Sequence, residues 1–330
     1  MTDNLFFLTM GNESYPSSRY RGYNFSKILN NLRVQTEIWP QGSLRDPLRL
    51  IKVILKLFRN KNLVYFQKIN NVYSLPLFLL SKKFSNKVIF DFDDSIFLEQ
   101  PLRFRFIAKH SEIIVAGNSY LADYARQYNS NVYVIPTSID LEAIKNIKPE
   151  SKNKKDKKII IGWIGTYDNL KYLQEVKNPL ENLANKYDIE LQIIGPQNSL
   201  EGLPQFKNLK IKVTPWKLET EWKELSKIDI GIMPLPDDKW TRGKCGLKAL
   251  QYMALEIPAI ASNVGTNKEI IQNGKNGFLA SNEKDWTNYL EKLIQNPKLR
   301  EELGKAGRKT VEKDYSLEKN AKKLAEIIKS

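Results

Sequence analysis

The sequence predicts two doubly wound α/β domains, each a parallel sheet covered by helices on both faces. Short apolar runs alternate with helical patterns through both halves of the chain, which is typical of parallel sheets. A polar interruption separates the two series, and a helical stretch ends the chain. The 330 residues suit two domains that share a cleft.

The expected strands are short apolar runs with helical segments between most of them. In the first half they cover residues 5–10, 34–38, 63–67, 88–92, 113–116 and 132–135, and in the second half residues 159–164, 191–194, 209–213, 230–233, 257–261 and 277–280. The charged run 150–158, ESKNKKDKK, lacks periodicity, so we place a domain boundary near residue 152. Helices are expected at 283–295, 297–311 and 317–328.

Composition excludes several classes of protein. One cysteine excludes a disulfide framework, and one histidine, His110, excludes a histidine-rich metal site. These two counts suggest a reducing compartment, most simply the cytoplasm. The N-terminus lacks the pattern of a signal peptide and no apolar run could span a bilayer, so we expect a soluble or peripheral protein. The net charge of +15, from 52 Lys and Arg against 37 Asp and Glu, indicates an anionic partner, unless it reflects a lysine-rich proteome.

The stretch 229–262 predicts the phosphate-binding part of a nucleotide site. It has the pattern strand, loop, helix, strand, with Gly246 at the helix start and Lys244 and Lys248 spaced four residues apart. Two cations at a helix N-terminus oppose the helix dipole unless an anion compensates them. Cys245 is expected to be a small packed residue, since no base for a nucleophile is evident.

Two other loops after predicted strands carry groups suited to anions. Gly165 ends a strand and Lys171 follows six residues later, which suits an approach to a pyrophosphate, although Lys171 also fits a surface helix. Gly11 with Arg19 and Arg21 follows the first strand, and the two arginines could hold a phosphate or carboxylate or form a solvated helix start.

The cluster Asp91-Phe92-Asp93-Asp94 ends another predicted strand. Asp93 or Asp94 could act in a cleft as a base, an electrostatic stabiliser or an acceptor-hydroxyl ligand. Metal binding is the minority interpretation. The alternative is N-capping of the next helix by Asp94 or Ser95, which is compatible with a functional role.

The segment 44–62 is basic and amphipathic. Its cations Arg49, Lys52, Lys56 and Arg59 share one helical face. Such a helix could dock on an anionic membrane or form an ordinary surface helix with a solvated basic side.

The chain resembles family 4 of the glycosyltransferases, retaining enzymes of the GT-B fold, over nearly its whole length. The resemblance depends on SSRYR (17–21), FDFDDSIF (90–97), GWIGTYDNLKYL (162–173), VGTNKEIIQNGKNGFL (264–279) and the whole of 229–262. It implies an acceptor-binding domain over residues 1–152, a nucleotide-sugar donor domain over 153–312, and a last segment, 313–330, that returns to the first domain. Gly243 and Gln251 stand where two glutamates are usual, and Thr166 where an arginine is usual.

The resemblance implies a retaining transferase that moves a sugar from a UDP- or GDP-type donor to a glycan or lipid-linked acceptor in surface polysaccharide assembly. It implies a reaction that needs no metal. The alternatives are a nucleotide-sugar epimerase on the same fold and a non-catalytic protein that binds anions or membrane; no motif favours nucleic acid. Asp93 and Asp94 are the expected catalytic residues, and Gly11, Arg19 and Arg21 the acceptor-side residues. The expected donor residues are Gly165, Thr166, Lys171, Lys244, Cys245, Gly246, Leu247, Lys248 and Gln251. We expect the protein to lie in the cytoplasm or on the inner face of the cytoplasmic membrane.

Overall fold

A computed structural model describes residues 5–59, 63–68, 73–84, 86–147, 149, 158–195 and 200–329. The chain forms two compact units, one made of residues 1–138, 242–245 and 316–330 and the other of residues 139–241 and 246–315. The expected linker 150–158 lies outside the described residues, apart from Lys158. The change of unit at residue 138 lies before the boundary that we expected near residue 152.

The first unit contains a parallel six-stranded sheet of order β2-β1-β3-β4-β5-β6. The elements in chain order are β1 (Leu5–Thr9), α1 (Pro16–Ser18), the π-helix η1 (Arg19–Tyr23), α2 (Asn24–Asn31), β2 (Thr36–Pro40), η2 (Gln41–Arg45), α3 (Pro47–Arg59), β3 (Leu63–Gln67), α4 (Ser74–Lys83), β4 (Lys87–Phe92), α5 (Pro101–His110), β5 (Ile113–Ala116), α6 (Ser119–Arg126) and β6 (Val132–Val134). The last helix of the chain, α13 (Leu317–Lys329), also belongs to this unit.

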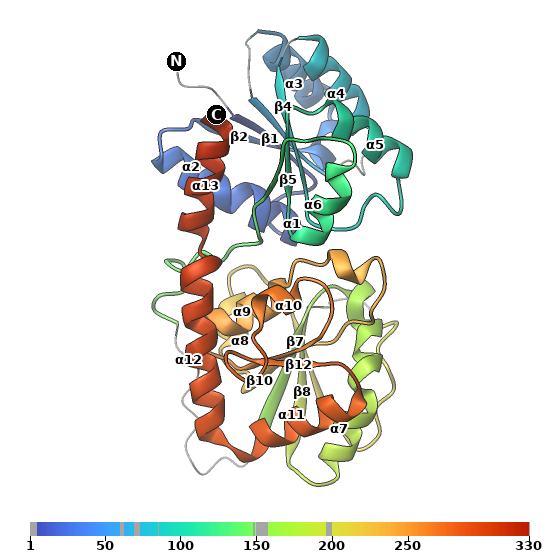
Figure 1. The fold of residues 1–330 in the computed structure, drawn as a ribbon, viewed down its shortest axis with the longest axis vertical. Coiled ribbons are helices and arrows are strands. Elements are labelled where there is room, and N and C mark those ends of the chain that lie inside the picture. Colours follow the sequence, from blue (N-terminus) through green and yellow to red (C-terminus); the bar gives the residue numbers. More distant parts are fainter. Residues whose placement is uncertain are drawn as a thin grey trace. The chain divides into compact units, whose positions relative to one another are not determined.

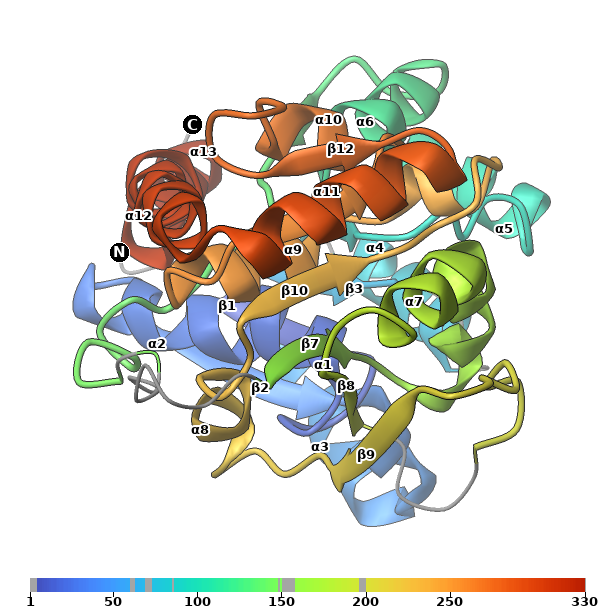
Figure 2. The ribbon, with the colours of Figure 1, turned by 90° about the horizontal axis from the view of Figure 1, so that it is seen from below.

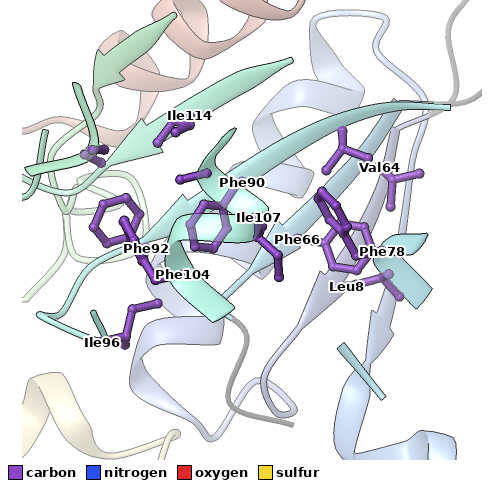
Figure 3. Close-up of a cluster of buried hydrophobic side chains, with 14 of the residues drawn as sticks. Leu8, Val64, Phe66, Phe78, Phe90, Phe92, Ile96, Phe104, Ile107 and Ile114 are labelled. Carbon is purple, nitrogen blue, oxygen red and sulfur yellow. The ribbon is translucent and has the colours of Figure 1, made fainter. Parts of the chain in front are cut away.

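Helices cover both faces of this first sheet, as expected from its largely apolar strands (Figure 1). One face packs against α3, α4, α5 and α6 through an aromatic-rich cluster that includes Phe66, Phe78, Phe90 and Phe104 (Figure 3). The other face packs against α2 and α13. The helices around the first sheet therefore come from both ends of the chain.

The second unit contains a second parallel six-stranded sheet, of order β12-β11-β10-β7-β8-β9, which Figure 2 shows from β9 through β7 and β10 to β12. Its elements are β7 (Ile159–Ile164), η3 (Tyr167–Val176), α7 (Lys177–Ala184), β8 (Ile189–Gly195), β9 (Lys210–Pro215), α8 (Glu221–Leu225), β10 (Ile230–Met233), α9 (Leu247–Ala254), β11 (Ala259–Ser262), α10 (Asn267–Ile270), β12 (Phe278–Ala280), α11 (Glu283–Gln295) and α12 (Pro297–Asp314). A short turn of helix, η4 (Thr241–Gly243), precedes α9.

The two sheets confirm the predicted fold class of parallel, doubly wound α/β units. The predicted strands match the observed ones to within a few residues; the strand predicted at 34–38, for example, spans Thr36–Pro40. Within the described residues, none of the helices has the length and hydropathy needed to cross a membrane.

Candidate functional site

The second sheet changes direction between β7 and β10. Strands β7, β8 and β9 follow one another towards one edge of the sheet, and β10, β11 and β12 towards the other. Ligands of open parallel sheets bind beyond the carboxyl ends of the strands at such a switch point. Gly165 follows β7, and the segment that leads to α9 follows β10, so these are the segments in which to look for a site.

The N-terminus of α9 has the features of an anion site. Gly246 occupies the N-cap with φ +70°, in the left-handed region that favours glycine, and a Cβ there would lie 2.2 Å from Ile270 Cδ1. No side chain caps the helix, and its first turn has no acidic residue. The first backbone N–H groups of a helix lack intrahelical partners, so this end presents donors and partial positive charge.

Lys248 lies in the first turn of α9 and extends towards the end of β7. Its Nζ lies 5.3 Å from the centre of the buried Trp163 ring. A Cβ on Gly165 would lie 3.1 Å from Lys248 Cε and 2.6 Å from the Trp163 ring. The structure therefore brings Gly165 and Lys248, predicted separately, together at the switch point.

Tyr252, which sequence reasoning did not single out, fixes α9 against both central strands. Its hydroxyl accepts a hydrogen bond from Ile164 N at 3.2 Å and lies 3.3 Å from the oxygen of Ile232, to which it donates. Its ring covers Gly231, where a Cβ would lie 2.2 Å from the ring. Burial raises the pKa of the Tyr252 hydroxyl, so the group remains a neutral donor.

Gln251 is buried and bonded to an acid that sequence reasoning missed. Its Nε2 donates to Glu221 Oε1 at 2.6 Å, and both residues are only 2% exposed. Glu221 begins α8, thirty residues away, where an acidic residue is ordinary at a helix start. The sequence therefore held no signal that would pair these two residues.

The remaining predicted donor residues of the second unit lie near the surface. Thr166 is exposed, and its hydroxyl accepts from Asn169 Nδ2 at 2.7 Å. Lys171 is exposed on η3, with its ammonium 5.6 Å from the centre of the Tyr172 ring. Leu247 is the first residue of α9 and contributes a backbone N–H to its positive end.

A cavity of about 360 Å³ lies beyond the ends of β10, β11 and β12 in the same unit. The charged residues in its lining are Lys268 and three acids, Glu175, Asp237 and Glu283. This excess of carboxylates disfavours a diphosphate, so the α9 N-terminus is the better anion site.

In the first unit, two aspartates and two lysines form one ionic cluster. Lys68, directly after β3, lies 2.7 Å from Asp93 Oδ1 and also pairs with Asp94. Lys244 Nζ lies 3.2 Å from Asp94 Oδ1. The cluster lies beyond the carboxyl ends of β3 and β4, beside the point between β1 and β3 where the first sheet changes direction.

Charge pairing fixes the protonation state of Asp94. Burial alone would raise its pKa, but Lys68 and Lys244 outweigh that effect and lower the pKa to about 2. Burial would lower the pKa of the Lys68 ammonium, whereas Asp93 and Asp94 raise it. Asp94 is thus a permanent carboxylate, suited to electrostatic stabilisation and poorly suited to accepting a proton.

The placement of Lys244 corrects one expectation. Because α9 begins at Leu247, Lys244 precedes the helix, and the helical four-residue spacing with Lys248 does not apply. Lys244 belongs to the first unit and is paired with Asp94, whereas Lys248 belongs to the second unit.

Gly243 and Cys245 are packed tightly into the first unit. A Cβ on Gly243 would lie 2.1 Å from Ser95 Oγ, and the Gly243 oxygen accepts from Asn118 Nδ2 at 3.0 Å. Cys245 Sγ lies 3.3 Å from the backbone oxygen of Asp93. Cys245 is buried, as expected of a small packed residue, and burial first, then the charge of Asp93, raise the pKa of its thiol, which disfavours a thiolate.

Arg21 requires a correction, because its guanidinium is already occupied inside the first unit. It is 1% exposed; Nε lies 2.9 Å from both Asp91 carboxylate oxygens, Nη2 lies 2.5 Å from Oδ1, and Nη1 donates to the Ile135 oxygen at 2.9 Å. Burial would lower the Arg21 pKa, but Asp91 outweighs it and raises that pKa, whereas burial raises the Asp91 pKa against the effect of Arg21. An internal ion pair of this kind leaves Arg21 unsuited to holding an acceptor anion.

Arg19 and Gly11 lie near the same end of the sheet. Arg19 is buried, and its guanidinium carbon lies 4.8 Å from the centre of the Tyr20 ring. Gly11 N donates to Ser18 Oγ at 3.0 Å, and a Cβ on Gly11 would lie 2.9 Å from Tyr15 Cβ. Gly11 is therefore required by local packing.

Histidine, cysteine and carboxylate side chains within the described part of the chain do not gather in groups of three that could hold a metal ion.

Comparison with known proteins identifies the family. The model of the glycosyl transferases group 1 matches residues 144–310, just over half of the chain. The capsular polysaccharide biosynthesis glycosyltransferase CapM of Staphylococcus aureus is 25% identical over 183 residues, which are 52% of this chain and 47% of CapM. The match therefore spans about half the length of that relative.

Solved structures show the same fold along the entire chain. HepE of Anabaena, in complex with UDP and glucose, superposes with a TM-score of 0.72 at 12% identity, and the alignment covers 100% of both chains. A glycosyltransferase from Rickettsia africae superposes with a TM-score of 0.73 at 16% identity, over 99% of this chain and 98% of that one. The chain belongs to the group 1 glycosyl transferases and has the GT-B fold.

Proposed function

We propose that this protein is a retaining glycosyltransferase that moves a sugar from a nucleoside diphosphate donor to a glycan or lipid-linked acceptor in cell-surface polysaccharide assembly. The observation that carries the proposal is the meeting of Lys248, Gly165 and the uncapped N-terminus of α9 at the switch point of the second sheet. The UDP bound to HepE and the capsule-related name of CapM support the donor and the process.

The second unit would stabilise the departing diphosphate. Negative charge grows on the diphosphate as the bond to the sugar breaks, and groups placed where charge develops lower the barrier. The Lys248 ammonium and the first N–H groups of α9 are such groups. The partial positive charge at the N-terminal end of the helix dipole adds to their attraction for the diphosphate. Trp163 and Tyr252 hold these donors in place before the substrate binds.

The first unit would bind the acceptor near Asp93 and Asp94. A carboxylate with a pKa of about 2 keeps its charge through the reaction, so Asp94 would stabilise positive charge on the sugar or orient an acceptor hydroxyl. Lys68 holds both aspartates and would act as a positioning residue.

The test compares Lys248→Ala with Lys292→Ala. Lys292 is a matched control, because its ammonium also lies over a ring of the second unit, 5.8 Å from the centre of Tyr289, but on α11. We expect UDP, GDP or their sugars to raise the melting temperature of the wild type. Lys248→Ala should lower kcat/KM for transfer by about a hundredfold, the size of effect that one such donor has elsewhere.

Full transfer activity in Lys248→Ala would remove the phosphate role from this residue. Wild-type protein that converts a UDP-sugar alone into an epimer, with no transfer to any acceptor, would replace the transferase proposal with epimerisation. Binding of no nucleotide would favour a non-catalytic protein.

A further inference from the structure

Helix α3 has a second apolar face that its own domain does not cover. Leu48, Ile51, Leu55 and Phe58 are 69%, 52%, 47% and 66% exposed. They are spaced by three, four and three residues, which places them in one row along the helix. We call these four residues the α3 stripe.

The core of the first unit does not need the α3 stripe. Val53 and Leu57 are buried on the other side of the helix, and Leu50 and Ile54 pack partly against the same cluster. A surface helix of a doubly wound sheet needs one apolar face, and α3 already has it. The stripe therefore requires an explanation outside the domain.

Exposed apolar residues continue onto the neighbouring helices of the same sheet face. Leu79 on α4 is 49% exposed, and Leu102 and Phe106 on α5 are 81% and 39% exposed. Ring contacts connect the helices, since Phe58 lies 4.8 Å from Phe84 and Phe78 lies 6.2 Å from Phe106, measured between ring centres. Figure 1 shows α3, α4 and α5 on this side of the first sheet.

Cations border this apolar surface. Arg49 and Lys52 lie beside the stripe on the solvent side of α3, and both are exposed. Lys83 on α4 and Arg105 and Lys109 on α5 are exposed as well. Three acids pair with cations of these helices: Asp46 lies 3.6 Å from Arg49, Glu37 pairs with Lys56, and Glu112 pairs with Lys82. The surface thus joins apolar side chains with an excess of positive charge.

We propose that the outer faces of α3, α4 and α5 dock the protein on an anionic lipid bilayer. An amphipathic helix with apolar and basic faces side by side lies in the plane of a membrane, with its apolar residues at the boundary of headgroups and acyl chains. The bordering cations attract anionic headgroups. The proposal rests on the surface alone and holds whether or not the protein transfers sugars.

Vesicle co-sedimentation of the full chain tests the proposal. The vesicles contain either phosphatidylcholine alone or phosphatidylcholine with phosphatidylglycerol. We expect the wild type to bind the anionic vesicles, to bind the neutral ones at least about tenfold more weakly, and to lose affinity as salt rises.

Two variants separate the apolar and ionic contributions. Replacing all four residues of the α3 stripe by serine should lower affinity by at least about tenfold, and so should Arg49→Glu with Lys52→Glu. Lys186→Glu with Lys210→Glu is the matched control, because it makes the same change of charge at exposed lysines of the second unit. This control should bind almost as the wild type does.

Several results would overturn the proposal. Equal binding of the wild type to both vesicle types, or unchanged binding by the serine variant, would do so. Self-association of the wild type that the serine variant abolishes, without vesicle binding, would assign the surface to a second copy of the chain. Thermal unfolding of each variant, expected near the wild-type temperature since the changed side chains are exposed, excludes misfolding as the cause.

Discussion

Among single residues, Asp94 shows how neighbours decide the chemistry of a site. The sequence predicted that Asp93 or Asp94 could act as a base or as an electrostatic stabiliser. The structure favours the role of electrostatic stabiliser, because two lysines pair with Asp94. Lys68 follows a different strand, and Lys244 comes from a segment about 150 residues later. Neither lysine could be paired with Asp94 from the sequence, because such pairs depend on the fold and not on spacing.

Asp94→Asn should reveal this pairing through pH. The variant should be about 2 kcal/mol less stable than the wild type near neutrality, because the two lysines lose a charged partner. The Asp94 pKa is lower in the folded protein than its ordinary value of 3.8, so its contribution is complete above pH 3.8 and is lost as the pH falls towards 2. Urea unfolding across this range should therefore show the difference between variant and wild type shrinking.

Asp123→Asn serves as the control, because Asp123 pairs with Arg126 on an exposed helix surface, where its side chain is 73% exposed. The free energy of unfolding of Asp123→Asn should differ little from that of the wild type at every pH. If the difference in free energy of unfolding between Asp94→Asn and the wild type stays the same from pH 5 to pH 2, the pairing of Asp94 with Lys68 and Lys244 is contradicted.

At the scale of the element, the Tyr252 hydroxyl connects α9 to both central strands by hydrogen bonds. Tyr252→Phe should lower the free energy of unfolding by about 1 kcal/mol, because Ile164 N and the Ile232 oxygen lose a buried partner. It should also weaken nucleotide binding, since the helix that presents Lys248 becomes less firmly placed. Urea unfolding and the UDP-induced shift in melting temperature measure the two effects.

Tyr187→Phe is the matched change in the same unit. Its hydroxyl donates to Glu291 at 2.9 Å in a partly exposed place, where water can replace the bond. We expect Tyr187→Phe to lose little stability and to show the same UDP-induced shift in melting temperature as the wild type. If UDP shifts the melting temperature of Tyr252→Phe as much as that of Tyr187→Phe, the position of α9 does not affect nucleotide binding, which would contradict the donor site at α9.

Elements were predictable where the information is local. Runs such as residues 159–164 and 230–233 are apolar for their whole length, as strands buried on both faces must be, and both appear as predicted. Lys244 lies in the loop before Gly246, whose left-handed conformation precedes the helix start at Leu247, so the helical spacing that we inferred for Lys244 and Lys248 was wrong. Gln251 and Glu221, thirty residues apart on α9 and α8, could not be paired from the sequence because their contact depends on the fold.

At the scale of the whole molecule, the first unit is completed by the end of the chain. Leu317, Ala321 and Leu324 of α13 are buried against the same sheet face as Phe25 and Leu29 of α2. The resemblance implied that the last segment returns to the first domain, while the periodicity alone predicted only a helix. Residues 1–138 by themselves would expose this apolar face, so we do not expect them to fold as an independent domain.

Leu324→Ala tests that dependence. Leu324 is fully buried, so the change should cost about 3 kcal/mol through lost burial and the cavity left behind. Leu102→Ala is the control, because Leu102 is 81% exposed and its truncation should change stability little. Hydrogen exchange should show faster opening of β1 and β3 in Leu324→Ala, while protection of β7 and β10 stays at the wild-type level, since those strands belong to the other unit. Uniform loss of protection in both sheets would mean that the two units unfold as one, and an unaffected first sheet would show that α13 is not part of its core.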